Sequence, residues 1–445
     1  MQYGWLMPDF GKAMARILGL RRKFESLLET ARNKAGRAAE VPGQQTGRLR
    51  ELTTFGANPG SLRMFVYVPR HLPRLAPLVV ALHGCGQSAE EYDCGAGWSS
   101  LADRFGFVVL YPQQQPANNP KNCFSWFLPG DIARDQGEAL SIRQMIEHAI
   151  ATFGVDRRRM FVTGLSAGGA MASVMLATYP EVFAGGAIIA GLPYGCARSA
   201  QQAFDAMFTE QSPSAHALGD RVRAASRHRG PWPKISVWHG TADPIVKPSN
   251  AENIVSQWID VHGLEAAFSY EKSSGSYTRK VWTDANGDAL IEAFSISGMA
   301  HGVPLGSAMG GEFCGSPGAF FLDAGISSTH HIARFWRLDE GAIEILPREI
   351  ATAPALRAIS TGGGAVVKAG ETACSWSKPD EASPGREGER RAHAPLDPNV
   401  VIAAAFKAAG LPVPEAPPSH AGATLRVAPG PIIEAALKAA GLTQR

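Results

Sequence analysis

The sequence lacks the features that mark several classes of protein. Its six cysteines (Cys85, Cys94, Cys123, Cys196, Cys314 and Cys374) form no CxxC pair, and they are too few for a disulfide scaffold or a zinc cluster. The sequence leaves room for one or two disulfide bridges and does not decide which cysteines form them. No apolar run approaches the ~20 residues that cross a bilayer. Pro8, Asp9 and Lys12 interrupt the start of the chain, where a secretory signal would be apolar.

An excess of charge of one sign is also missing. The chain has 43 Lys and Arg against 40 Asp and Glu, which gives a net charge of +3 spread along its length. The basic run 157–159 is interpreted as a solvated turn rather than as part of a basic field. We therefore expect no nucleic-acid partner.

The composition is that of an ordinary globular protein. Hydrophobic residues make up 45% and charged residues 19% of the 445 residues. This length is enough for one large α/β domain with flanking segments. The composition changes along the chain and predicts four parts. These are an amphipathic helix and linker at 1–50, a catalytic domain at 51–338, a linker at 339–398, and two short repeated helices at 399–445.

The two repeated segments, 401–411 and 432–442, are rich in alanine and each ends near a glycine. A repeat present only twice is too short for a solenoid. We interpret the two segments as helices that dock on a partner or a polymer surface, with tail helices of no specific role as the alternative.

The region 51–338 alternates short β-rich runs with helical patterns. The run 77–82 is apolar throughout, as is typical of a strand buried on both faces of a sheet. Strands that alternate with helices predict an α/β fold with a mostly parallel, doubly wound sheet and flanking helices. The strands are expected at 62–68 (an edge strand), 77–82, 107–111, 159–163, 186–190 and 234–238, with a meander at 268–270, 279–282 and 291–296. Helices are expected at 135–152, from 167 onward, and at 329–336.

The strongest chemical motif is GxSxG at 164–168, which places Ser166 between an expected strand and an expected helix. This is the context of the nucleophile elbow in α/β-hydrolases. A tight turn holds the serine in strained backbone geometry, and the helix N-terminus beside it favours a developing oxyanion. Ser166 is therefore the candidate nucleophile.

The acid and the base follow the nucleophile in this fold, in the order Ser, Asp or Glu, His. Asp243 follows the buried run 234–238 through a glycine turn, and a structural aspartate accepting backbone N–H bonds is its alternative. His301 lies in a glycine-flanked loop after the run 291–296. Weaker candidates are Asp220 and Asp260 for the acid, and His148, His228, His330 and His331 for the base.

An oxyanion hole needs two backbone N–H groups. One belongs to Ala167, the residue after the serine, and the other is expected from Cys85 in the turn 82–86 after an early strand. Cys85 as the nucleophile is a minor alternative, because Ser166 has the better scaffold. A bridge between Cys85 and Cys123 would stiffen this turn and is a further hypothesis.

These motifs together resemble the polyhydroxybutyrate (PHB) depolymerase family of esterases, which includes feruloyl and acetylxylan esterase relatives. The resemblance covers roughly 50–338. It is carried by 82–85, 97–98, 111–112, 122–127, 164–169, 238–243 and 298–302.

The resemblance implies a serine esterase without metal or cofactor that acts through Ser166, His301 and Asp243. Its expected substrates are esters of short-chain hydroxy acids, above all poly(3-hydroxybutyrate) or its oligomers. A feruloyl or acetylxylan esterase is the first alternative, followed by a peptidase or acyltransferase of the same fold and a non-catalytic binding protein. Trp98 and Trp126 are expected to line the acyl site or, equally, to pack in the core.

The resemblance also implies an extracellular protein. The absence of a visible signal peptide leaves a cytoplasmic location as the alternative.

Overall fold

The computed structural model describes residues 48–210, 212–306 and 314–340. The chain divides into two units, and every described residue lies in the first, Met1–Trp376. The helix predicted within 1–50, the linker at 339–398 and the repeated segments at 399–445 lie almost wholly outside the described residues. Their assignments stay predictions.

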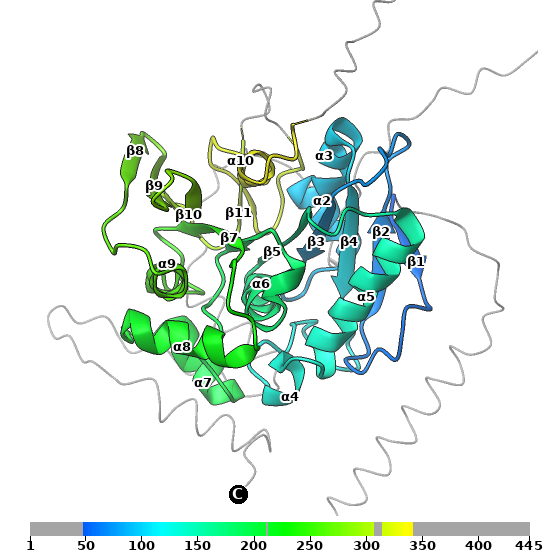
Figure 1. The fold of residues 1–445 in the computed structure, drawn as a ribbon, viewed down its shortest axis with the longest axis horizontal. Coiled ribbons are helices and arrows are strands. Elements are labelled where there is room, and N and C mark those ends of the chain that lie inside the picture. Colours follow the sequence, from blue (N-terminus) through cyan, green and yellow to red (C-terminus); the bar gives the residue numbers. More distant parts are fainter. Residues whose placement is uncertain (1–47, 211, 307–313, 341–445) are drawn as a thin grey trace, which may run out of the picture. The chain divides into compact units, whose positions relative to one another are not determined.

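A ten-stranded sheet forms the centre of the described region, in the order β1-β2-β4-β3-β5-β6-β7-β10-β9-β8 (Figure 1). The strands from β4 to β10 in this order run parallel, and antiparallel strands border them on both sides. This is the mostly parallel sheet that the sequence predicts. The strands are β1 Arg50–Leu52, β2 Arg63–Tyr67, β3 Leu78–Leu82, β4 Val108–Gln113, β5 Met160–Leu165, β6 Gly185–Ile189, β7 Lys234–Gly240, β8 Tyr270–Ser274, β9 Tyr277–Thr283 and β10 Ala289–Ile296.

One strand prediction needs correction. The strand predicted at 62–68 is β2, but it is not an edge strand, because β1 pairs outside it from Arg50↔Val66 to Leu52↔Met64. The three residues of β1 are too few to show an alternating pattern in the sequence. A second, small sheet of β11 Val303–Leu305 and β12 Phe321–Asp323 was not predicted either.

Helices cover both faces of the large sheet. The alternation along β3 divides its side chains, with Leu78, Val80 and Leu82 in one hydrophobic core and Val79 and Ala81 in the other. Helices α5, α6, α8 and α9 contribute to the first core, and α2, α3 and α10 to the second. The helices are α2 Ala89–Ala96, α3 Trp98–Phe105, α4 Pro129–Ile132, α5 Gly137–Phe153, α6 Ala167–Thr178, α7 Ala200–Phe208, α8 Ala215–Ala225, α9 Ser249–His262 and α10 Ser328–Phe335, with a 3-10 turn at Pro180–Val182.

Helix α6, which follows the GxSxG motif, is buried all round: each of its residues from Ala167 to Thr178 is buried. A helix that is apolar on every side belongs to the interior of a protein. Small residues in its first turn let it approach the sheet, since a Cβ at Gly169 would lie 2.9 Å from the carbonyl oxygen of Ile189.

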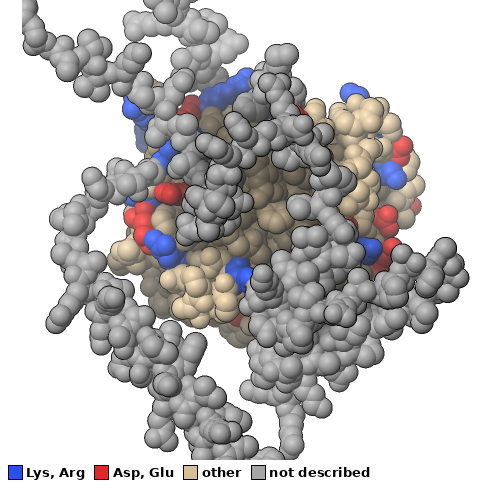
Figure 2. Space-filling model, turned by 180° about the vertical axis from the view of Figure 1, so that it is seen from behind, with Lys and Arg blue, Asp and Glu red and all other residues tan. Residues whose placement is uncertain are grey.

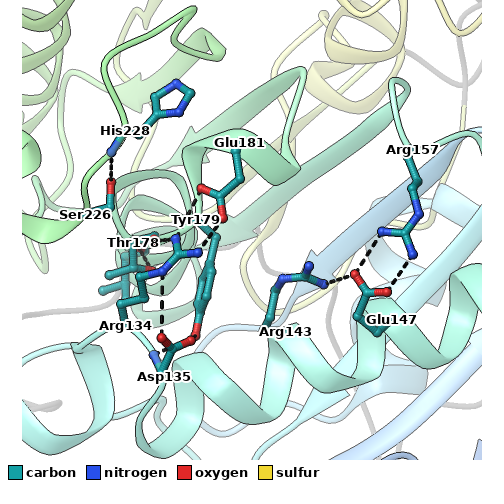
Figure 3. A network of polar contacts seen from close by, with 11 residues as sticks. Arg134, Asp135, Arg143, Glu147, Arg157, Thr178, Tyr179, Glu181, Ser226 and His228 are labelled. Atoms are coloured by element: carbon teal, nitrogen blue, oxygen red, sulfur yellow. Dashed lines mark hydrogen bonds and ion pairs between the residues drawn. The ribbon is translucent and has the colours of Figure 1, made fainter.

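Ion pairs hold the loops on either side of α5 at the surface (Figure 3). Arg134 forms an ion pair with Glu181 at 2.6 Å and donates to the carbonyl oxygen of Thr178 at the end of α6. Glu147 on α5 accepts from Arg157, and this contact lowers the pKa of Glu147 to about 2.

Each arginine of the basic run 157–159 forms a contact within the molecule. Arg157 pairs with Glu147, Arg158 with Asp156, and Arg159 donates to the carbonyl oxygen of Arg337. On the visible described surface, basic and acidic side chains are interspersed around the rim (Figure 2).

Trp98 starts α3 in the second core. Its side chain is 0% exposed and stacks on Trp336, which in turn stacks on Phe161 of β5. We expect Trp98→Ala to lower the free energy of unfolding by about 3–5 kcal/mol, because the cavity left behind loses these contacts. Denaturant titration measures the loss. Trp232→Ala, at a partly exposed tryptophan, is the control and should cost less; equal losses would contradict the prediction.

Candidate active site

Ser166 occupies a strained turn between β5 and α6. Its backbone has φ 57° and ψ −118°, a region that residues other than glycine rarely adopt. The turn is held from both sides: the Ser166 N–H donates to Ile189 at 2.9 Å, and its carbonyl accepts from Ala170 at 2.8 Å. The backbone that carries the Ser166 hydroxyl is therefore fixed in position at the end of β5.

The glycines of the motif are required by close backbone approach. A Cβ at Gly164 would lie 2.4 Å from the backbone of Gly168, and a Cβ at Gly168 would lie 2.2 Å from the carbonyl oxygen of Leu82 and 2.5 Å from that of His83. The second contact places the start of α6 directly against the turn that carries the predicted oxyanion donor.

Asp243 and His301 form a direct hydrogen bond. Nδ1 of His301 lies 2.7 Å from Oδ2 of Asp243, and both side chains are buried. Since the carboxylate accepts, Nδ1 carries the hydrogen, and Nε2 of His301 is left as the basic nitrogen. The other carboxylate oxygen, Oδ1, accepts from the N–H groups of Ile245 and Val246 at 2.8 and 2.9 Å.

The carboxylate of Asp243 is held in its ionised form. Burial raises the pKa of Asp243, but hydrogen bonds from His239 and His301 outweigh burial and keep this pKa well below its usual range. A permanent negative charge beside His301 favours the imidazolium that forms when His301 takes a proton.

The topology brings the three predicted residues to one edge of the sheet. Ser166 follows β5, Asp243 follows β7 and His301 follows β10, and these strands are parallel with only β6 between β5 and β7. The carboxyl ends of parallel strands meet at the same edge, where α/β folds bind ligands. Ser166 and His301 make no direct hydrogen bond within the described residues. Such bonds often tighten only when substrate binds.

The turn after β3 is fixed by a disulfide and by hydrogen bonds. Cys85 and Cys123 are bridged, as hypothesised from the sequence. The Gly86 N–H donates to Lys121 at 2.7 Å, and the Gly84 N–H donates to the side chain of Gln87 at 2.8 Å. The neighbours of Cys85 are thus held, while within the described residues its own N–H has no acceptor. The first N–H groups of α6, starting at Ala167, have no intrahelical acceptor either.

His83 braces this turn from behind. Nδ1 of His83 contacts the carbonyl oxygen of Gly84 at 2.8 Å, and Nε2 accepts from the Gln114 N–H at 3.1 Å. The acceptor role of Nε2 assigns the hydrogen to Nδ1. Burial lowers the pKa of His83 to about 4, so the imidazole stays neutral near neutral pH. His83 is therefore a structural residue.

The buried carboxyl group of Glu138 holds the neighbouring segments through further hydrogen bonds. Glu138 on α5 accepts from the Gln114 side chain at 2.6 Å and from the Ser125 N–H at 2.9 Å, and Gln114 also donates to the carbonyl oxygen of Cys123. These bonds tie the bridged segment around Cys123 to the core. Burial raises the pKa of Glu138 to about 7.

The two tryptophans have different positions. Trp98 lies fully in the core, which supports its packing interpretation and not a place along the acyl site. Trp126 is 7% exposed and contacts Phe127 edge-on, and its substrate role stays a prediction.

The weaker candidates are engaged elsewhere. Asp220 and Asp260 both pair with Arg223, and His228 contacts the carbonyl oxygen of Pro231. His148 lies within α5, and His330 within α10.

Sequence reasoning missed the residues that support the site. His239 contacts Asp243 at 3.2 Å, and Gln114 joins Glu138 to His83 in the turn 82–86. The signal for His239 was present, because it lies in the same stretch 238–243 as the acid. The partners of Glu138 come from distant loops, and no sequence pattern joins them.

A cavity of about 710 Å³ lies between α4, the loop after β6, and helices α7 and α8. Tyr194, Cys196, Arg198 and Arg221 line it, but Ser166, Asp243 and His301 do not. Within residues 48–210, 212–306 and 314–340, no cluster of three or more His, Cys, Asp or Glu side chains could hold a metal ion. No helix of the described chain is long and apolar enough to cross a membrane.

Fold and site together define a class, the carboxylic ester hydrolases of the α/β-hydrolase fold. An acetyl xylan esterase structure from Aspergillus awamori matches with a TM-score of 0.54 at 26% identity, covering 57% of this chain and 94% of that structure.

The family model described as "Esterase PHB depolymerase" matches residues 62–280. Poly(3-hydroxyalkanoate) depolymerase C of Paucimonas lemoignei is 47% identical over 289 residues, covering 65% of this chain and 70% of that protein. An acetylxylan esterase of Coprinopsis cinerea is 35% identical, covering 60% and 71% respectively. The chain belongs to the PHB depolymerase family of esterases, as the resemblance predicted, and it is a hydrolase.

The raised pKa of Glu138 predicts a pH dependence of stability. A carboxyl group that titrates near 7 when folded and near 4.5 when unfolded stabilises the fold below pH 4.5, and this contribution is lost as pH rises through 7. The free energy of unfolding of the wild type should fall by about 3 kcal/mol between pH 4.5 and 8 through this group, and we expect Glu138→Gln to abolish this fall. Denaturant titrations of both proteins across this range measure it, with exposed Glu90→Gln as the control. Parallel wild-type and Glu138→Gln curves would refute the prediction.

Proposed function

We propose that Ser166, His301 and Asp243 form a catalytic triad that hydrolyses esters through an acyl-enzyme. The observation that carries this proposal is the Asp243–His301 hydrogen bond at the sheet edge where Ser166 occupies its strained turn. Nε2 of His301 takes the proton of the Ser166 hydroxyl as its oxygen attacks the ester carbonyl. The N–H groups of Cys85 and Ala167 bind the oxyanion of the tetrahedral intermediate.

The second half of the reaction reuses the same groups. His301 protonates the leaving alcohol, and the acyl group remains on Ser166. His301 then removes a proton from water, which attacks the acyl-enzyme and releases the carboxylic acid. Asp243 stays ionised throughout and stabilises the imidazolium of His301.

The proposed substrate is poly(3-hydroxybutyrate) or its soluble oligomers. The 47% identity to a poly(3-hydroxyalkanoate) depolymerase supports it. A feruloyl or acetylxylan esterase is the second candidate, favoured by relatives of 34–35% identity that carry those names. We place the enzyme outside the cytoplasm, because the Cys85–Cys123 bridge is typical of an oxidising compartment.

Ser166→Ala tests the triad and the substrate together. We expect loss of at least about three orders of magnitude in 3-hydroxybutyrate release, because the alanine has no nucleophile. Assays on poly(3-hydroxybutyrate), its oligomers, methyl ferulate and acetylated xylan identify the substrate. The exposed Ser274→Ala is the control. Retained turnover in Ser166→Ala would refute the triad, and activity on ferulate or xylan esters alone would leave the triad and overturn the substrate.

The bridge tests the oxyanion assignment. We expect the double variant Cys85→Ser, Cys123→Ser to lower kcat by roughly tenfold or more with little change in KM, because the Cys85 N–H loses its fixed position. Cys196→Ser, at a free cysteine, is the control. Steady-state kinetics on para-nitrophenyl butyrate give both constants. An unchanged kcat in a folded double variant would contradict the assignment.

A further inference from the structure

A second histidine contacts the carboxylate of Asp243. His239 lies near the end of β7 with a side chain only 3% exposed. Its Nε2 is 3.2 Å from Oδ2 of Asp243 and 2.9 Å from the carbonyl oxygen of Val246. Both neighbours are acceptors, so Nε2 of His239 must carry a hydrogen and donate it.

The surroundings of the other ring nitrogen of His239 indicate which nitrogen carries the hydrogen. Nδ1 is buried and has no hydrogen-bond partner among the described residues. A proton there would leave a buried N–H donor unpaired, which costs more than an unpaired weak acceptor. We therefore assign the donated hydrogen of His239 to Nε2.

We propose that His239 is a positioning residue that fixes the carboxylate of Asp243, and through it the ring of His301, in the orientation needed for proton transfer. This inference rests on the triad given under Proposed function. With His239 present, Oδ2 of Asp243 accepts from His301 and Oδ1 accepts from two backbone N–H groups. The single Nε2–H of His239 is shared between Oδ2 at 3.2 Å and the carbonyl oxygen of Val246 at 2.9 Å. The carboxylate cannot rotate without breaking one of these bonds.

The donor also tunes the base. An N–H on Oδ2 withdraws negative charge from the oxygen that holds the Nδ1–H of His301. Loss of this donor makes Asp243 more basic and strengthens its hold on the imidazolium. The titratable groups that face Asp243 are His239 from β7 and His301 from the loop after β10, while the register partner of His239 on β10 is Ser295.

Replacing His239 with Gln or with Asn, whose amides reach to different lengths, distinguishes the positioning role from a packing role. The Gln side chain places its amide nitrogen where Nε2 of His239 lies, whereas the shorter Asn does not reach Oδ2. We expect His239→Asn to lower kcat roughly tenfold and to move the acidic limb of the kcat/KM profile up by about 0.5–1 pH unit. His239→Gln should restore the wild-type midpoint.

The measurement is the pH profile on para-nitrophenyl butyrate, with active enzyme counted by an organophosphate that labels the nucleophilic serine. His262→Gln is the matched control, because His262 is a mostly buried histidine that also contacts a backbone carbonyl, that of Pro233, but lies away from the triad. It should leave the midpoint unchanged.

The results separate the two proposals. A shift in His239→Asn that His239→Gln reverses supports the positioning role. Unshifted midpoints in both variants, or equal shifts in both, overturn it. Activity that survives in Ser166→Ala overturns the triad itself, whatever the His239 variants show.

Discussion

The site depends on one close backbone contact, that between Gly168 and the carbonyl oxygens of Leu82 and His83. This contact sets the turn that carries Ser166 against the turn 82–86, although their strands are formed by residues some eighty positions apart. Any side chain at position 168 would separate the two turns, and with them the N–H groups of Cys85 and Ala167. The disulfide, the bonds of Gln87 and the brace of His83 then fix one turn, while α6 fixes the other.

The protein buries several carboxyl groups, and their pKa values move in opposite directions. Asp243 accepts hydrogen bonds from His301 and from two backbone N–H groups and contacts His239, and its pKa falls below the usual range despite burial. Glu138 accepts hydrogen bonds from Gln114 and Ser125, which do not offset burial, and its pKa rises to about 7. Asp93, bonded to Tyr111 and Ser99, also has a raised pKa. The balance between burial and the nearby donors thus decides the direction in which the pKa of each buried acid moves.

The sequence predicted the parts of the molecule that local patterns encode. Apolar runs such as 78–82 marked the buried strands, and the position of Ser166 between a strand and a helix marked the turn. Asp243 and His301, which lie in hydrogen-bond contact, were singled out because each follows a strand in a glycine-containing loop. The edge position of β2 was predicted wrongly, because β1 is too short to give a pattern. The support of the site by His239, Gln114 and Glu138 depends on contacts between distant segments, which hydrophobic periodicity does not report.

Helix α6 is buried on every side, and its first turn approaches the backbone of the neighbouring strands. Such an element leaves almost no neutral substitutions, because each side chain is either too small to shrink or too confined to grow. We therefore expect substitutions to be tolerated better in the loops that surround the helix than in α6 itself. Changes in those loops can alter which ester fits while the turn that carries Ser166 keeps its shape.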